Sequence, residues 1–401
     1  MQLKHNNQTG AVSLFVVIFA MLLISIITIG FVRLMVQDQE QAINRDLSQS
    51  AYDSAVAGTE DAKRALLTYR TTCEDTTVAG RAKCAQLATA LNSTECNRGI
   101  QYVNQGGTYA PGEVIIQKSA TSEQLDQAYT CVKVALQTDS YDGMLEENTS
   151  KLVPLKVSGS FNTIVMKWFV RDNLAGTNPN VTLSELGPGD TSPPLLSDTT
   201  WGNRRPPLLR TQLMQVGNNF TLTGFDTSSG DQSNANTMFL YPIGTTGTKS
   251  TAQDAFTIVT QDTRRSGGIV PLGTRCSGTL ADGGYACTAR LRVPQPIGNT
   301  GSDLTRTAYL RLTALYNSTD FRVELYNDAT LVKFDSVQPT IDSTGRANDV
   351  FRRLESRVDL VNTTFPYPEA TVDITGNLCK NMVVTNDSTK YKSGSTTCNP
   401  N

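Results

Sequence analysis

The sequence predicts an α+β protein: a long N-terminal transmembrane and amphipathic helix, then a disulfide-stapled, mostly β extracellular region with a sandwich-like arrangement of strands. Three observations support this prediction. Residues 11–32 carry no charged side chain, and about 20 apolar residues are enough to cross a bilayer as a helix. A helical period continues from there to Tyr69. Beyond residue 71 the pattern changes to alternating strands and eight cysteines.

The first ten residues form a polar leader that ends in Gly10 and precedes the apolar segment. An ordinary secretory signal has its cleavage site after the apolar segment, which is therefore removed with the signal. Here the small-residue junction Gln8-Thr9-Gly10 comes first, so a cut after Gly10 leaves the apolar segment at the start of the mature chain. A plain signal-anchor is the alternative. Lys4 in the short N-terminal tail favours an orientation with the N-terminus inside.

The helical pattern continues beyond the apolar segment. Small and apolar residues recur at steps of three or four and would line one helix face: Ile43, Leu47, Ala51, Ala55, Gly58, Ala62, Leu66 and Tyr69. No proline occurs before Pro111, so nothing obliges the helix to break. A continuous helix over residues 11–69 would be a rod of about 90 Å. Its stripe of alanine and glycine would let a sheet or a second helix approach the backbone closely.

Three segments of this helix resemble the N-terminal region of PilX-type minor type IV pilins: GAVSLFVVIFA from Gly10, DQEQA from Asp38 and AYDSAVAGTEDAKRAL from Ala51. The resemblance covers residues 1–70. It implies that a prepilin peptidase cuts between Gly10 and Ala11 and methylates the new N-terminus. Major pilins usually have a glutamate at the fifth mature position, where this chain has Phe15. That departure resembles minor and tip-located pilins.

A second stretch, residues 341–358, resembles a segment of pilin-like proteins of ultrasmall bacteria. Together these resemblances imply a minor type IV pilin, a class that includes tip-located subunits. Such a protein is a structural component of a surface filament involved in pilus assembly, adhesion or cell–cell contact. Its partners would be other pilins, bound through the N-terminal helix, and the prepilin peptidase. Before assembly it would sit in the cytoplasmic membrane as a single-pass protein with its N-terminus inside, and afterwards in an extracellular pilus at the cell surface.

Two alternatives from other classes stay open. The first is a membrane-anchored surface adhesin that is not part of a filament. The second is a minor pseudopilin of a type II secretion system, which shares the missing glutamate and the long first helix. The sequence does not identify a ligand of the outer domain.

Composition and motifs argue against an enzyme or a nucleic-acid-binding protein. The chain has 35 Lys+Arg and 37 Asp+Glu, so no strong positive field would attract nucleic acid. His5 is the only histidine and lies in the leader, so the mature chain has no imidazole for a catalytic triad or a histidine-containing zinc site. We therefore expect no catalytic residue, no cofactor and no metal site. The polar loop 226–234 could hold Ca²⁺ through oxygens, but it lacks EF-hand spacing and is more simply a surface loop. Sequons at Asn92, Asn317 and Asn362 matter only if the host glycosylates exported proteins.

The even number of cysteines indicates an oxidising compartment and disulfides. All of them follow residue 70: Cys73, Cys84, Cys96, Cys131, Cys276, Cys287, Cys379 and Cys398. The nearest neighbours in sequence suggest the pairs Cys276–Cys287 and Cys379–Cys398. A C-terminal loop closed in this way resembles the loop that many type IV pilins carry. The first four cysteines allow three pairings, of which Cys73–Cys84 with Cys96–Cys131 is favoured.

We divide the chain into a leader (1–10), a pilin-like helix (11–70, with the membrane span at 11–32), a disulfide-containing connecting region (71–150) and a β-rich extracellular domain (151–401) with a long loop at 173–207. Alternating patterns predict strands at Val153–Val157, Thr163–Val170, Leu208–Val216, Thr237–Tyr241, Ala255–Thr260, Tyr285–Val293, Ala308–Tyr316, Phe321–Tyr326, Leu331–Phe334 and Val350–Leu360. Short helices are expected near Arg81–Leu91 and Ser122–Ala128. Short strands at this spacing favour a sandwich.

Overall fold

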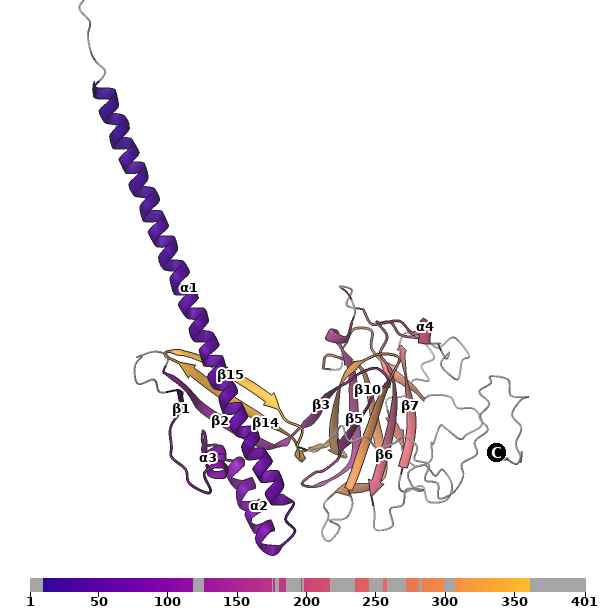
Figure 1. The fold of residues 1–401 in the computed structure, drawn as a ribbon. Helices are drawn as coiled ribbons and strands as arrows, with labels where there is room; N and C mark the ends of the chain where they lie inside the picture. The colour runs from indigo at the N-terminus through magenta and orange to yellow at the C-terminus, as the bar shows by residue number, and fades with distance from the viewer. Residues whose placement is uncertain are drawn as a thin grey trace, which may run out of the picture. The chain divides into compact units, whose positions relative to one another are not determined.

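The computed structural model describes residues 10–117, 126–174, 176, 180–184, 196, 198–216, 235–244, 255–257, 272–280, 283–298 and 307–360. The chain divides into two compact units, residues 1–363 and 364–401, and all described residues belong to the first. Its first element, α1 (Gly10–Cys73), is an uninterrupted helix of 64 residues (Figure 1). The predicted long N-terminal helix is therefore confirmed, and it continues to the first cysteine.

Two short helices follow α1. The first, α2 (Val78–Leu91), confirms the helix expected near Arg81–Leu91, and the side chain of Thr77 caps it by accepting a hydrogen bond from the backbone N–H of Gly80 at 3.0 Å. The second, α3 (Arg98–Asn104), was not expected from the sequence. The helix expected at Ser122–Ala128 is wrong in its described part, because residues 127 and 128 begin a strand that pairs with a distant partner.

Four antiparallel strands form the sheet on which the second half of α1 lies, which we call the helix-bearing sheet (Figure 1). Its strand order is β1 (Val114–Gln117), β2 (Gln127–Thr138), β14 (Phe334–Ala347) and β15 (Val350–Arg357). Strands from both the 71–150 and the 151–401 regions therefore build this sheet. Residues 341–358 cover most of the β14–β15 hairpin.

The remaining described strands form one eleven-stranded sheet with the path β13-β12-β5-β10-β9-β7-β6-β11-β4, with β3 beside β12 and β8 beside β10. Their bounds are β3 (Ser140–Leu145), β4 (Ser150–Pro154), β5 (Ser160–Val170), β6 (Leu208–Val216), β7 (Ala235–Gly244), β8 (Ala255–Thr257), β9 (Leu272–Cys276), β10 (Tyr285–Gly298), β11 (Thr307–Leu315), β12 (Thr319–Asn327) and β13 (Thr330–Val332). A sandwich of two separate sheets is not confirmed, because β9 pairs with both β10 and β7 and so joins the strands into one continuous ladder.

The predicted strands coincide in position with observed strands, although not in every boundary, and the one at Val350–Leu360 is β15 of the helix-bearing sheet. The strand expected at Val153–Val157 begins and ends earlier, as β4, and the one expected at Leu331–Phe334 is divided between β13 and β14. The sequence missed β1, β2, β3 and β9, and all of β14 after its first residue. The expected loop at 173–207 contains a short helix, α4 (Asp198–Trp201), in its described part.

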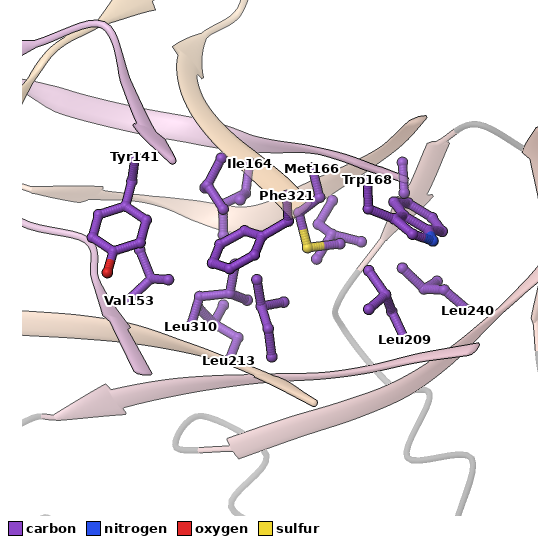
Figure 2. Packing of buried hydrophobic residues seen from close by; sticks show 14 of the residues in the cluster. Tyr141, Val153, Ile164, Met166, Trp168, Leu209, Leu213, Leu240, Leu310 and Phe321 are labelled. Atoms are coloured by element: carbon purple, nitrogen blue, oxygen red, sulfur yellow. The ribbon is translucent and has the colours of Figure 1, made fainter. Parts of the chain in front are cut away.

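One hydrophobic core fills the space that the large sheet encloses. Figure 2 shows Ile164, Met166 and Trp168 of β5 pointing toward leucines of β6, β7 and β11. These three side chains are at most 1% exposed, as their alternation in the sequence predicts. Burying a large apolar side chain contributes about 1.5–3 kcal/mol, so the sheet is held in its curled form by its inner face. Its outer face carries the intervening residues of each strand.

Candidate functional site

The first half of α1 lies free of the rest of the described chain and is apolar on all sides. Its large apolar side chains, from Leu14 to Val36, are 47–76% exposed. The most apolar 18-residue window has a mean hydropathy of 2.9, and none of it is buried. A soluble monomer seldom exposes a contiguous apolar surface of this size. By length and composition, this part of the helix is suited to cross a membrane.

The second half of α1 packs against the helix-bearing sheet at very short range. Ala51, Ala55, Ala62 and Leu66 are fully buried. A Cβ atom added to Gly345 on β14 would lie 2.2 Å from both the carbonyl oxygen of Ala51 and the amide nitrogen of Ala55. The predicted small-residue stripe is therefore the surface on which strand backbone meets helix backbone. Its first member, Ile43, is an exception, because it is 50% exposed and contacts no buried cluster.

A Cβ atom at Gly58 would meet the sheet in the same way, at 2.6 Å from Ser343 Oγ and 2.7 Å from a methyl group of Val132. Glycine on the helix thus faces β2 and β14, while glycine on β14 faces the helix. Any larger side chain at either position would force the two elements apart.

Hydrogen bonds fix the rotation of α1 on the sheet. Ser343 Oγ donates to the backbone carbonyl of Ala55 at 2.7 Å. Tyr129 OH, on β2, donates to Asp61 Oδ2 at 2.8 Å. Burial, followed by the hydrogen bond to Asp61 and its negative charge, raises the pKa of Tyr129 well above its usual range. Near the end of the helix, the hydroxyl of Tyr69 lies 3.1 Å from Ser336 Oγ.

Of the hydrogen bonds between α1 and strands in the described residues, the one nearest the membrane-suited half comes from β15. Arg352 Nε donates to Ser48 Oγ at 2.8 Å. From this point toward the N-terminus, the exposed positions of α1 begin. None of these polar contacts was predicted, because β2 and β14 could not be identified from the sequence pattern, and an isolated tyrosine or serine gives no signal of its partner.

The predicted processing residues Gly10 and Ala11 lie in the first turn of α1. The leader, residues 1–9, lies outside the described residues. Phe15, the fifth residue after the predicted cut, is 76% exposed. The structure therefore places the junction at the free end of the exposed half of the helix.

Three disulfides are present in the described part of the chain: Cys73–Cys84, Cys96–Cys131 and Cys276–Cys287. They agree with the favoured choice among the three pairings of the first four cysteines. The first joins the end of α1 to α2, and the second joins the α2–α3 loop to β2. The expected pair Cys379–Cys398 lies outside the described residues.

The structure also bears on the sequons and the polar loop. Asn317 uses its amide nitrogen to donate to the carbonyls of Gly202 and Arg205, each at 2.8 Å, so a glycan on this nitrogen would replace one of the two donor hydrogens and break at least one bond. Asn92 is exposed and uses only its oxygen, which accepts from the backbone of Leu136 at 3.0 Å. Asn362 and the loop 226–234 lie outside the described residues.

No family model, curated protein or solved structure matches this chain.

Proposed function

We propose that this protein is a minor subunit of a type IV pilus, anchored in the cytoplasmic membrane through α1 before it enters the filament. One observation carries the proposal: α1 is a single helix with two surfaces of different kind. Its first half presents bare apolar side chains, and its second half is locked onto a sheet of the same chain. A helix of this kind can transfer from lipid to a bundle of similar helices without any change in its own fold.

The physical requirements of such a transfer are met by the apolar half. A helix satisfies its backbone hydrogen bonds internally, so it is stable both in lipid and among apolar helices. The side chains of residues 11–32 bring no charge into either environment. The hydroxyls of Ser25 and Thr28 donate to helix carbonyls one turn earlier, at 2.8 Å each, so they are satisfied in both places as well.

The side chain at residue 15 supports a minor role. A carboxylate at this depth could pair with the N-terminal amine of a neighbouring subunit, and a buried unpaired ammonium is costly in lipid. Phe15 offers no such partner. A subunit without the carboxylate therefore fits fewer positions in a helical bundle than one that carries it. The end of the filament is the position at which a subunit has the fewest neighbours.

Fractionation of sheared filaments tests this proposal. We expect the wild-type protein in the filament fraction together with other pilins. Gly10→Val should hold it in the membrane fraction, because a peptidase that requires a very small residue before the scissile bond can no longer cut. Gly159→Val is the matched control, since a Cβ at Gly159 meets no atom within 4 Å, and it should behave as wild type.

Two results would count against the proposal. If the wild-type protein stays in the membrane fraction and cells that lack it form normal filaments, a membrane-anchored adhesin is the better account. If it instead co-purifies with a secretion apparatus, the pseudopilin alternative is favoured.

A further inference from the structure

A second feature lies on the outer face of the large sheet. A cavity of about 630 Å³ opens over β9, β10, β5 and β12. This volume is within the range of small-ligand sites, about 300–1,000 Å³. β5 and β10 are neighbouring strands in Figure 1, with Val165 opposite Arg290 in the ladder. On its other side, Val165 is opposite Glu324 of β12.

Residue size explains why this face is hollowed. The central strand β5 contributes two short side chains, Thr163 and Val165, to the floor of the cavity, and a long one, Lys167, at one end. The strands on either side contribute long ones, with Glu324 and Tyr326 on β12 and Arg290 on β10. A row of short residues between rows of long residues forms a trough along the middle strand, because side chains stand roughly perpendicular to a sheet.

The charged groups of the trough are of both signs. Lys167 Nζ donates to both oxygens of Glu324, at 3.0 and 3.1 Å, and Tyr326 OH donates to the same carboxylate at 3.1 Å. Asp328 accepts from Asn162 Nδ2 at 2.7 Å. With Arg275 and Arg290, the described residues of the lining include three basic and two acidic side chains, a formal excess of one positive charge among them.

Arg290 is the basic side chain of the trough that bears on ligand binding. Its side chain is exposed and lines the cavity. Within the described ranges of the chain, no carboxylate forms an ion pair with it. Its guanidinium therefore has hydrogen-bond donors free for a ligand that enters the trough.

We infer that this trough binds a short acidic oligosaccharide. Sugar hydroxyls both donate and accept hydrogen bonds, so they match a surface that mixes carboxylates with a guanidinium. The carboxylate of a uronic acid unit would pair with Arg290. The apolar faces of the sugar rings would lie on Val165, Ala329 and the ring of Tyr326, which all line the cavity. This inference is independent of filament assembly.

Binding to the full chain in detergent micelles tests the inference. The probes are a uronate tetrasaccharide and a neutral glucose tetrasaccharide, and the readout is titration calorimetry at two salt concentrations. We expect the uronate probe to bind, to bind more weakly at higher salt, and to exceed the neutral probe in affinity. Arg290→Gln should weaken uronate binding at least about tenfold, because it removes a charge-assisted hydrogen bond.

Arg81→Gln is the matched control. Arg81 lies on α2, is exposed, and has no ion pair within the described residues. The Arg81→Gln variant should bind the uronate probe as the wild type does. Arg290→Lys should retain part of the affinity that Arg290→Gln loses, because the lysine keeps the positive charge. The inference is overturned if neither probe binds at millimolar concentration, or if Arg290→Gln binds the uronate probe as tightly as the control. Equal affinity for the two probes would overturn the acidic selectivity, and tighter binding of an acidic peptide would overturn the sugar assignment.

Discussion

The contact between α1 and β14 should be intolerant of a single methyl group. In Gly345→Ala, the added Cβ would lie 2.2 Å from two backbone atoms of α1, those of Ala51 and Ala55. Backbone atoms cannot rotate away, so the strand and helix must separate. Overpacking of this kind costs about 1–3 kcal/mol. The separation also stretches the 2.7 Å bond from Ser343 Oγ to Ala55, which is worth about 1 kcal/mol. We therefore expect a loss of about 2–4 kcal/mol.

Amide hydrogen exchange over residues 51–69 measures this loss where it occurs. Because each 1.4 kcal/mol is a factor of ten in an opening equilibrium, exchange in the second half of α1 should accelerate on the order of 10²-fold. Exchange in the core strands β5 and β12 should change much less. Gly159→Ala is the control, since its Cβ meets nothing within 4 Å. Equal protection of α1 in the two variants would refute the reasoning.

Three further predictions concern pH, disulfides and the membrane. Because the pKa of Tyr129 is raised in the folded protein, the unfolded chain loses this proton first, so stability should be full below about pH 10 and fall as the pH rises. Tyr129→Phe should reduce that fall in urea unfolding and cost about 1 kcal/mol at pH 7; an identical alkaline slope would contradict the assignment. Replacing Cys96 and Cys131 together with serine should lower the free energy of unfolding by about 2–4 kcal/mol, and an unchanged urea midpoint would argue against a structural role. Ile24→Arg should lower recovery in floated membranes, because an arginine at mid-bilayer costs about 2.5–3.5 kcal/mol, whereas Ile24→Leu should not; equal flotation of the two would contradict a membrane span here.

The sequence predicts α1 and its contact stripe well because both follow from local patterns. Absence of charge identifies the apolar half, and the spacing from Ala51 to Tyr69 identifies the buried face. The pattern could not show where the sheet ends, so Ile43 was placed in the stripe although it is exposed. The hydrogen bond from Arg352 of β15 reaches the helix at Ser48, more than one turn beyond Ile43.

Strands that cover the helix were harder to predict for a physical reason. On β14, the positions facing α1 include Ser343, which hydrogen-bonds to the helix, and Gly345, which lets the helix backbone approach closely. Neither residue is a large apolar one, so the apolar alternation that predicts a strand is broken there. Its partner β2 lies far away in the sequence, with Ser343 opposite Val132, so no local signal links the two. The large sheet is continuous because of β9, a strand of five residues that includes Gly273 and Thr274. It is too short and too polar to be predicted from alternation.

The central claim, that α1 is a pilin helix exposed by processing, is tested most directly at the N-terminus of the native protein. Mass spectrometry of protein taken from the cell surface should find a chain that begins at Ala11 and carries one additional methyl group. A chain that begins at Met1, or one that has lost residues 11–32, would contradict the account, because the apolar half of α1 could not then leave the membrane as part of a filament.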